Sequence, residues 1–411
     1  MYRERREQLL TSLPDYSITI LMSGQVKYNI GDEVYPFDVD RSFYYYTGLT
    51  RENLVLMLVK LPNTTKEILF IEPYDPLMAK WVGAKILPEE ARAISGIEDV
   101  RYVADLEDAI SMYINNWGKF HPFTLCGELS KQSLDQPWPV SELFNKVRTQ
   151  QPDVIIKNIC ENTARMRMVK SDDEIAKMSK AIAVTNSGIQ ALMQASRDYI
   201  WENELEAYFD FVLKSEQCEH AFHTICASGK NATVLHYGEN NQQTKPGDLV
   251  LIDLGAAYQY YNADISRTFP VSGRFTERQK EVYELVLRAN KLVEEKARPG
   301  VTTRELNNMV IDFYQRELPS IGLLQNGESV TDYYWHSCSH HIGLETHDVS
   351  LINEPLQAGN VISNEPGLYI EAEGIGVRIE DDIMITEDGC ICLSKDIIKE
   401  VSDIEAFFQN R

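Results

Sequence analysis

Apolar and polar positions alternate in short blocks over the first part of the chain. Strand-like apolar runs occupy residues 17–22, 52–60 and 66–73, and a helical pattern follows at 105–115. Strand-like runs that alternate with helical stretches are typical of an α/β domain. We therefore predict an α/β domain for the first part of the chain.

A strong helix signal opens the second part of the chain. Ser171 and Glu174 have the spacing of a capping box, whereas the pattern at 158–170 is weak. The apolar stripe after the box recurs at intervals near 3.6 residues: Ile175, Met178, Ile182, Ile189 and Leu192. A domain boundary is expected near residue 165, which gives an N-terminal domain over 1–165 and a second domain over 166–411.

The second domain shows two pairs of helices, each pair followed by strands. An apolar stripe at 205–213 predicts the second helix. Thr276 with Gln279, and Thr302 with Glu305, have capping-box spacing and predict the starts of two more helices. Apolar runs predict strands at 247–255, 258–269, 360–370 and 376–386. The second domain thus has the order helix, helix, strands, helix, helix, strands, and no internal repeat is evident in the sequence itself.

Composition and charge narrow the function. A chain of 411 residues with 44% hydrophobic residues is long enough for two folded domains. The net charge of −22 repels phosphate and acidic lipid, so we expect no nucleic-acid partner. The apolar run Ile18–Met22 is too short for a signal peptide or a membrane span, which favours a cytoplasmic protein without a membrane partner. Seven scattered cysteines indicate reduced thiols.

Two aspartates stand in apolar strand patterns. Asp253 lies inside LVLIDLG, and Asp264 follows in NADISRTF. A short turn between the strands would place both carboxylates side by side in an antiparallel pair. Adjacent carboxylates repel each other unless a cation or a shared proton lies between them. A lone aspartate in an apolar strand is more often hydrogen-bonded by backbone or by an arginine than bound to a metal.

The same pattern recurs downstream with glutamates. Glu365 lies in VISNEPGLY and Glu380 in VRIEDDIMI, and the segment WHSCSHHIGLETHD between the two pairs of acids carries four of the eight histidines. Four carboxylates and at least one imidazole suit two divalent ions, with Mn, Co or Zn preferred over Ca or Mg. His336 and His340 have the spacing of a zincin helix, but Ser337 replaces the glutamate that this motif requires.

Five segments together resemble a known family. GDLVLIDLG, NADISRTF, HSCSHHIGLETHD, SNEPGLY and GVRIEDD resemble, in this order, the ligand motifs of the pita-bread metallopeptidases. NATVLHYGENN and YPFDVDRSFYYYTGLTRENLVL are similar to aminopeptidase P within that family. The resemblance covers nearly the whole chain. It implies an N-terminal α/β domain followed by a pseudo-symmetric pita-bread (creatinase/aminopeptidase-like) α+β catalytic domain.

The resemblance also implies a ligand set for two divalent ions, with Mn²⁺ expected and Zn²⁺ or Co²⁺ as alternatives. The ligands would be Asp253, Asp264, His340, Glu365 and Glu380. Asp264 and Glu380 would bridge both ions, Asp253 would hold one, and His340 with Glu365 would complete the other. In the family a water or hydroxide between the ions attacks the scissile carbonyl, and the residue that matches Glu365 shuttles its proton.

Four further residues match positions around the family's substrate site. His236, His336 and His347 would stabilise the oxyanion or relay a proton to the leaving proline nitrogen. Arg378 would support the centre from behind, meet the carboxyl side of the substrate or simply neutralise the acids. Trp81 resembles a tryptophan that reaches a neighbouring subunit's active site, which implies a homo-oligomer, a dimer or a tetramer; the alternative is packing within its own domain.

The remaining candidates have simpler interpretations. His341 is expected to be structural and Cys338 to be a small filler in the core. The other three histidines are expected to be exposed or hydrogen-bonded in place: His121, His220 and His223.

The function implied by the resemblance is hydrolysis of the bond between any N-terminal residue and a following proline, with proline-containing peptides as substrates. The nearest alternative is prolidase, which cuts only Xaa-Pro dipeptides. Methionine aminopeptidase fits less well, because such enzymes often consist of the catalytic domain alone. A metal-free relative that binds partners or catalyses amidinohydrolase chemistry is a further alternative, although such proteins depart from the ligand set retained in this chain.

Overall fold

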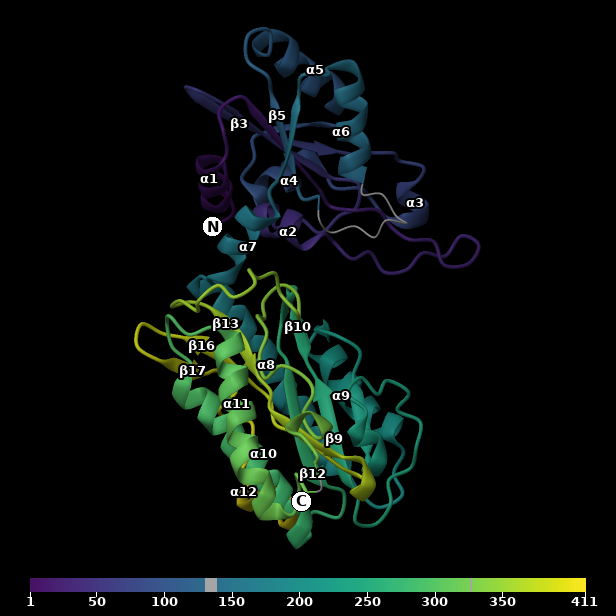
Figure 1. The fold of residues 1–411 in the computed structure, drawn as a ribbon. Coiled ribbons are helices and arrows are strands. Elements are labelled where there is room, and N and C mark those ends of the chain that lie inside the picture. The colour runs from purple at the N-terminus through teal and green to yellow at the C-terminus, as the bar shows by residue number, and fades with distance from the viewer. Residues whose placement is uncertain (130–138, 326) are drawn as a thin grey trace. The chain divides into compact units, whose positions relative to one another are not determined.

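The computed structural model describes residues 1–129, 139–325 and 327–411. The chain divides into two compact units, Met1–Met166 and Arg167–Arg411 (Figure 1). Each unit has its own sheet system and is described by itself.

The N-terminal unit is built on a six-stranded mixed sheet with the order β4-β3-β2-β1-β5-β6. β1 pairs antiparallel with β2 and parallel with β5, and nearly every residue of β1 is buried, as expected for a strand covered on both faces. The strands are β1 (Ser17–Met22), β2 (Val55–Leu61), β3 (Thr64–Ile71), β4 (Asp99–Tyr102), β5 (Thr124–Gly127) and β6 (Ile155–Asn158).

Helices cover this sheet. The helices are α1 (Tyr2–Ser12), α2 (Arg41–Thr47), α3 (Ala79–Val82), α4 (Pro88–Ser95), α5 (Leu106–Trp117), α6 (Pro139–Gln150) and α7 (Cys160–Met168), which spans the division between the units. Ile110 of α5 and Phe144 of α6 join the core that Ile20 and Met57 form on the sheet. The pattern expected at 105–115 thus forms a helix whose apolar side faces the strands.

The second unit contains four small sheets, whose orders are β12-β9-β8, β13-β16-β17, β14-β15 and β11-β10-β7. Its strands are β7 (Glu219–His220), β8 (Ile225–Ser228), β9 (Leu249–Leu254), β10 (Ala256–Tyr258), β11 (Tyr261–Asn262), β12 (Ile265–Pro270), β13 (Val361–Asn364), β14 (Gly367–Ile370), β15 (Ile375–Arg378), β16 (Asp381–Ile385) and β17 (Cys390–Cys392). Two three-stranded antiparallel sheets, each preceded along the chain by a pair of helices, give the unit its repeated character.

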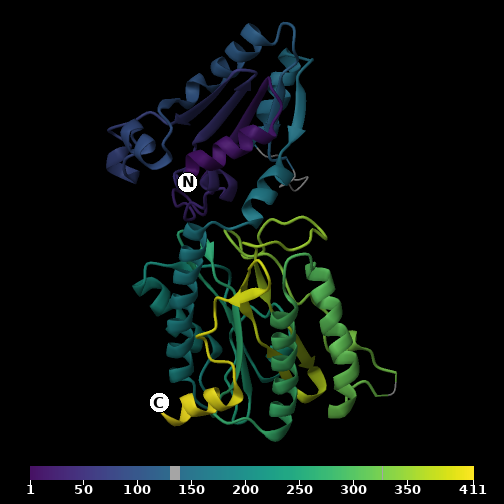
Figure 2. The ribbon, with the colours of Figure 1, turned by 90° about the vertical axis from the view of Figure 1, so that its left-hand side faces the viewer.

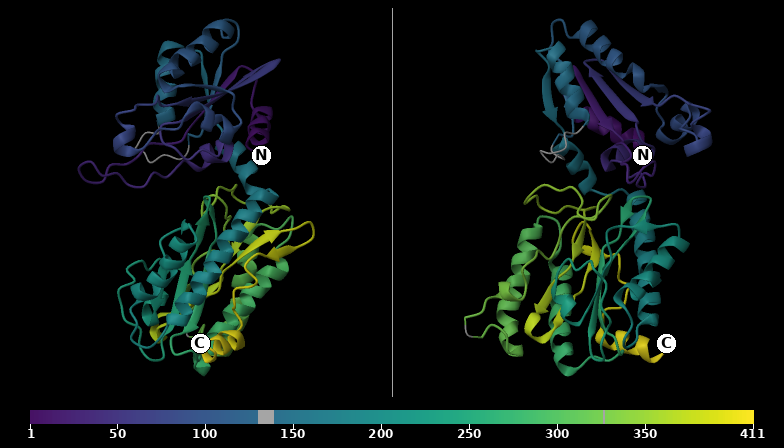
Figure 3. Two further views of the ribbon diagram at one scale, coloured as in Figure 1. Left: turned by 180° about the vertical axis from the view of Figure 1, so that it is seen from behind. Right: turned by 90° about the vertical axis from the view of Figure 1, so that its right-hand side faces the viewer.

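Three of the five helices in the described part of the second unit begin where the capping patterns predict. The five are α8 (Asp172–Ala195), α9 (Glu202–Ser215), α10 (Glu277–Lys296), α11 (Thr303–Glu317) and α12 (Val401–Gln409). The capping boxes at Ser171, Thr276 and Thr302 are all confirmed. α8 packs on α9 and α10 packs on α11; the view from behind in Figure 3 shows α8 in front of the strands. α12, yellow beside the C label in Figure 2, packs Phe408 against Phe269 of β12.

The prediction of one continuous strand at 258–269 is wrong. The chain turns back at Gln259 and Tyr260, whose φ angles of 50° and 67° are left-handed, so that β10 and β11 form a tight hairpin. β12 begins only at Ile265, and its Ser266 pairs with Asp253. Asp253 and Asp264 are therefore offset by two positions in the register and are not the directly opposed pair that a short turn would give.

Glu365 and Glu380 lie at a break shared by two neighbouring strand pairs. β13 ends at Asn364, which pairs with Asp381, and the β14–β15 pair begins at Gly367 opposite Arg378. Both glutamates fall between these two ladders. The break frees their side chains from the regular alternation of a strand, and both can point into the same space.

Candidate metal centre

One pocket of the second unit, with a volume of about 570 Å³, gathers the residues that the motifs single out. Its lining includes His236, Asp253, Asp264, His336, His340, His347, Glu365, Arg378 and Glu380. These residues come from β9, from the end of β15, from the breaks between strands and from two long connecting segments. The fold thus brings all nine predicted site residues to one place.

Three of the proposed ligands form a tight cluster. One carboxylate oxygen each from Asp264 and Glu380 and one ring nitrogen of His340 lie within 4.8 Å of one another. His340 Nε2 lies 3.4 Å from Asp264 Oδ2 and 3.3 Å from Glu365 Oε1. Ser266 donates to Glu380 Oε2 at 2.8 Å, which fixes that carboxylate.

The orientation of His340 leaves Nε2 directed at the acids. Nδ1 lies 3.1 Å from the carbonyl oxygen of His341. Since a carbonyl can only accept, Nδ1 carries the hydrogen and Nε2 of the neutral ring presents a lone pair to the two carboxylates. A lone pair and two anionic oxygens repel one another unless a proton or a cation lies between them. A backbone bond at one ring nitrogen with the other left for an ion is the usual arrangement of a metal-binding histidine.

Asp253 is oriented by a buried arginine. Arg378 Nη2 donates to Asp253 Oδ2 at 2.6 Å, while Arg378 Nε donates to Ser266 and Nη1 to Tyr369. Arg378 is 4% exposed, so its guanidinium supports the acids from behind. Asp253 Oδ1 is buried and has no hydrogen-bond partner among the residues that the structure describes. A buried carboxylate oxygen without a partner is costly, which makes it a candidate ligand atom.

Burial raises the pKa values of the clustered carboxyl groups. The pKa of Asp264 rises to about 6 through burial and repulsion from Asp253, and that of Glu365 to about 7 through burial and repulsion from Asp264. The same causes raise the pKa of Glu380 well above its ordinary value. Burial disfavours the charged form of His340, but Asp264 and Glu365 outweigh it and raise its pKa to about 9.

The donor set therefore fits divalent metal. Four acids and one imidazole converge, and Arg378 is the guanidinium that contacts them. Protons and a divalent cation compete for the same oxygen and nitrogen atoms, so the raised pKa values mark a centre that is short of positive charge. Three or more oxygen ligands with one imidazole suit Mn²⁺, Co²⁺ or Zn²⁺.

Comparison with known proteins agrees with this chemistry. Residues 176–387 match the sequence model of metallopeptidase family M24, and residues 2–120 match that of the aminopeptidase P N-terminal domain. The chain belongs to metallopeptidase family M24. It therefore has an N-terminal domain of the aminopeptidase P type followed by an M24 catalytic domain, as the motifs imply.

Related proteins match this M24 metallopeptidase over nearly its whole length. The Xaa-Pro aminopeptidase of Haemophilus influenzae is 32% identical, over 98% of this chain and 96% of its own. A solved structure from Bacillus anthracis, assigned to aminopeptidase P, is 45% identical with a TM-score of 0.95, over 100% of this chain and 98% of its own. Aminopeptidase P from Escherichia coli, solved with the inhibitor Pro-Leu, is 28% identical with a TM-score of 0.91 and the same coverage.

Several general properties of the M24 metallopeptidase follow from its family and its structure. As a member of a metallopeptidase family it is a metal-dependent enzyme that acts on peptides. Over the described ranges, no helix has the length and apolarity needed to cross a bilayer. The seven cysteines are all free thiols.

The structure also identifies supporting residues of this metallopeptidase that the motifs did not single out. Asp382 is completely buried and accepts a hydrogen bond from the backbone nitrogen of Asp264 at 3.3 Å. Burial, followed by repulsion from Asp264, raises the pKa of Asp382 well above its ordinary value. Ser363 donates to Glu365 Oε1 and accepts from the backbone nitrogen of His340. The run of three acids at 380–382 was the available signal for Asp382.

His336 belongs to a chain of hydrogen bonds. Its Nδ1 donates to the carbonyl of Ser337 at 2.8 Å, so its Nε2 accepts from the Tyr369 hydroxyl at 2.9 Å. That hydroxyl in turn accepts from Arg378. Burial, followed by the nearby Arg378 charge, lowers the pKa of His336 to about 4, which keeps the ring neutral.

The other two pocket histidines are exposed. His347 stands edge-on to His340, with the ring centroids 4.3 Å apart, and burial followed by the charge on His340 lowers its pKa. His236 lies on the irregular segment that follows β8. Both rings line the pocket next to the clustered ligands but do not belong to the cluster.

The remaining histidines and Cys338 match their simpler interpretations, with one addition. His121 stacks on Tyr16, His220 pairs with Asp210, and His341 is buried behind the centre. Burial raises the pKa of the fully buried Cys338 far above that of a reactive thiol. His223, which donates to the carbonyl of Gly238 at 2.8 Å, also lines the pocket.

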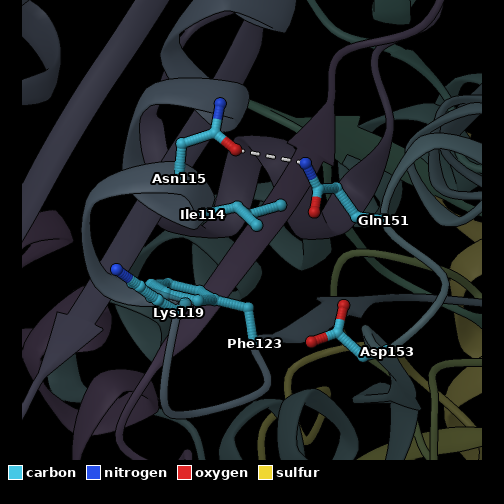
Figure 4. Close-up of a pocket in the computed structure, with 7 residues that line it drawn as sticks. Ile114, Asn115, Lys119, Phe123, Gln151 and Asp153 are labelled. Atoms are coloured by element: carbon cyan, nitrogen blue, oxygen red, sulfur yellow. Dashed lines mark hydrogen bonds between the residues drawn. The ribbon is translucent and has the colours of Figure 1, made fainter.

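A second hollow, of about 300 Å³, lies in the N-terminal unit between α5 and the end of α6 (Figure 4). Asn115 and Gln151 are joined by a hydrogen bond of 3.1 Å across it, and Lys119 and Asp153 stand at its edge. Its lining contains one carboxylate and no histidine. This hollow therefore lacks the ligands of a metal centre, and the chemistry belongs to the pocket of the second unit.

Proposed function

We propose that this metallopeptidase removes the N-terminal residue from peptides whose second residue is proline. The observation that carries the proposal is the convergence of five potential metal ligands, the three predicted substrate-site histidines and Arg378 in one pocket. The relative from H. influenzae bears the name Xaa-Pro aminopeptidase, and the E. coli structure contains Pro-Leu, which begins with proline as a product of such cleavage does.

In this proposal five residues hold two divalent ions, with Mn²⁺ as the expected metal: Asp253, Asp264, His340, Glu365 and Glu380. The clustered acids, the lone pair of His340 Nε2 and the buried Asp253 Oδ1 support this assignment. When bound, a pair of divalent ions lowers the pKa of water toward neutrality and polarises a carbonyl group. No serine or cysteine nucleophile is then required.

Glu365 is the proposed proton carrier. A carboxylate at this place can take a proton from the attacking water and return it. Ser363 donates to Oε1, while Oε2 lies 3.7 Å from His336 Nδ1 and faces the pocket. The carboxylate is thus held at one oxygen and available at the other.

The pocket histidines are proposed to act on the substrate. His236 and His347 are exposed at the pocket and would donate to the developing oxyanion or to the proline nitrogen. His336 is fixed as a neutral ring by Tyr369. Of the roles considered for Arg378, its bonds to Asp253, Ser266 and Tyr369 favour support of the centre over contact with the substrate.

Peptide kinetics test the specificity. We expect Xaa-Pro-Yaa to be cleaved and Xaa-Ala-Yaa to be cleaved far more slowly, because the proposed proton donors serve a tertiary amide nitrogen. Comparable kcat/KM values for the two peptides would refute the proline preference while leaving a metallopeptidase. Comparison of Xaa-Pro with Xaa-Pro-Yaa distinguishes the dipeptidase alternative, for which the tripeptide would be inert.

Metal removal tests the cofactor. Chelation should abolish activity, and Mn²⁺ should restore it at least as well as Zn²⁺, because carboxylates outnumber imidazole four to one in the proposed ligand set. Full activity of protein shown by elemental analysis to contain no metal would end the proposal.

We further propose that residues 1–165 and 166–411 are separate domains and that the protein acts in the cytoplasm. We also propose that the chain forms a homo-oligomer, a dimer or a tetramer. Trp81 does not pack into its own unit: it is 79% exposed, and α3 buries none of its residues. Leu77 and Val82 beside it are also largely exposed. Exposed apolar side chains of this kind are typical of protein contacts. Light scattering should give a multiple of the 47.0 kDa chain mass, and Trp81→Glu should lower it.

A further inference from the structure

The segment that carries His236 has little regular structure of its own. After β8 the chain forms a short 3-10 helix (Gly229–Thr233) and then runs without a named strand until β9. Leu235, His236 and Gly238 of this segment line the pocket. Over the part of the chain that the structure describes, the His236 ring makes no hydrogen bond. Its position therefore depends on what holds the neighbouring backbone.

One buried carboxylate holds that backbone. Glu202 is the first residue of α9 and is completely buried. Its Oε1 accepts from the backbone nitrogen and the hydroxyl of Ser228, both at 2.7 Å, and from Asn231 at 3.0 Å. Its Oε2 accepts from the Tyr237 hydroxyl at 2.7 Å and from the backbone nitrogen of Gln242 at 3.0 Å.

All five donors come from the His236 segment or from the strand residue that begins it. Ser228 is the last residue of β8, Tyr237 directly follows His236, and Gln242 lies beyond the pocket. The backbone nitrogen of Glu202 also donates to the carbonyl of Gln242 at 2.9 Å. The two ends and the middle of the segment are thus tied to one side chain of α9.

The donors are neutral groups, and the helix N-terminus adds a partial positive charge, so a buried anion can persist at this point. Five donors that converge on two acceptor oxygens require a carboxylate at this position. An amide of the same size would replace one oxygen with an NH₂ group, which would face donors and leave two or three of them without an acceptor. The hydrogen-bond network therefore depends on both the charge and the shape of the Glu202 side chain.

We infer that Glu202 is a positioning residue that sets the place of His236 in the pocket. This inference rests on the proposed function. Glu202 acts through Tyr237 and the surrounding backbone and does not touch the substrate. The proposed metal ligands lie on other segments and make none of the hydrogen bonds described above for the Glu202 side chain.

Kinetics of Glu202→Gln, His236→Ala and the double variant test the inference on an Xaa-Pro-Yaa peptide. Displacement of a catalytic group by about 1 Å costs on the order of 10²-fold, so Glu202→Gln should lower kcat by about that factor while both metals remain bound. The double variant should be no slower than His236→Ala alone. Multiplied losses in the double variant, unchanged kcat in Glu202→Gln or loss of metal would each overturn the inference.

Two further variants separate positioning from general destabilisation. Glu204→Gln is the matched control, because Glu204 lies in the same helical turn but pairs with Arg197 at the surface; its kinetics should equal those of the natural protein. Tyr237→Phe removes one of the five donors without a change in charge. It should lower kcat less than Glu202→Gln does, and the loss should vanish when His236 is alanine. A loss that persists in that background would count against positioning.

Hydrogen exchange gives a readout that is independent of substrate. The backbone amides of residues 229–243 should exchange faster in Glu202→Gln than in the natural protein, whereas those of β9 should not change. Unchanged exchange of the segment would overturn the inference whatever the kinetics show. If the natural protein fails to cleave Xaa-Pro peptides while exchange rises as expected, the proposed function is refuted and the anchoring of the segment by Glu202 stands.

Discussion

The proposed metal ligands and two exposed histidines of the same pocket, His236 and His347, are held in place by different means. Asp253 lies within β9, and Glu365 and Glu380 lie at the ends of paired strands. His236 and His347 lie on connecting segments that have no strand partner at those positions. Backbone ladders therefore place the acids, whereas side-chain hydrogen bonds must place the histidines.

Asp348 does for His347 what Glu202 does for His236. Its carboxylate is buried and accepts from Arg167 Nη2 at 2.5 Å and from Lys170 Nζ at 3.2 Å, while its backbone nitrogen donates to the carbonyl of His341. Gly343 makes room for it, because a Cβ there would lie 2.2 Å from Asp348 Oδ2. His236 is thus adjacent to Tyr237, which donates to buried Glu202. His347 is adjacent to Asp348, whose own buried carboxylate accepts from two cations.

This contrast has a practical consequence for mutagenesis. Replacing an acid of the centre should change charge and metal affinity while the strands keep the backbone in place. Replacing a supporting carboxylate should instead move a loop and leave the metal bound.

The largest effect is expected for His340→Ala. Its Nε2 faces Asp264 and Glu365, so the variant should lose at least one metal ion and with it nearly all activity. Elemental analysis and steady-state kinetics measure both losses. A metal-depleted His347→Ala together with an intact His340→Ala would show that the ligand is the other histidine.

Smaller losses are expected for His236→Ala and His347→Ala. Both variants should keep their metal, and kcat should fall by roughly 10²–10⁴-fold, the usual cost of deleting a positioned proton donor. Melting curves serve as the control. Variants that melt at lower temperature but retain full activity per folded molecule would assign these histidines a structural role instead.

Asp348→Asn should act on stability and on kcat together. Lys170 would remain buried without this anion and Arg167 would keep only the more exposed Glu345, which costs about 3–5 kcal/mol of unfolding free energy. Urea unfolding measures this loss. Glu345→Gln is the control: Glu345 binds the same arginine but its side chain is 41% exposed, so the change should stay within about 1 kcal/mol. Equal stability of the two variants would break the comparison.

The smallest effect is a dependence of metal affinity on pH. The raised pKa values of about 6 for Asp264 and about 7 for Glu365 mean that protons must leave as metal binds. Affinity for Mn²⁺ should therefore tighten by more than roughly tenfold between pH 5.5 and 7.5, as measured by calorimetry. An affinity that does not vary with pH would contradict protonated acids at this centre.

The same shifts fix the sign of the stability change. In the metal-free protein these acids hold protons that the unfolded chain has already released above its ordinary pKa near 4, so the fold binds more protons between about pH 4 and 7. The contribution of these acids to stability should therefore fall as pH rises through that range. The metal-loaded protein should not show this fall, so the two melting temperatures should diverge.

Local signals in the sequence predict much of the fold. The capping boxes at Ser171, Thr276 and Thr302 are confirmed because each depends on residues three positions apart. The strand pattern at 17–22 coincides with β1 because it, too, depends only on residues close together in the sequence. The family membership is likewise carried by short motifs, each of which stays together in one segment of the chain.

Contacts between distant segments could not be predicted in this way. The register of β12 on β9 depends on the turn at Gln259 and Tyr260, where neither residue is the glycine that usually marks left-handed backbone. Glu202 lies in a helix start that looks like many others, and its five donors follow 26 to 40 positions later along the chain. The residues of a buried carboxylate network do not recur at a regular spacing, so no sequence pattern predicts the network.

The exposure of Trp81 also provides an optical probe. An indole in water emits at longer wavelength than one in an apolar contact, and Trp81, at 79% exposed, stands almost fully in water in the single chain. Dilution of an assembled sample should therefore shift the fluorescence to the red as copies separate, and Trp81→Phe should remove that component of the shift. The spectrum would then report the association constant of the assembly at concentrations too low for scattering.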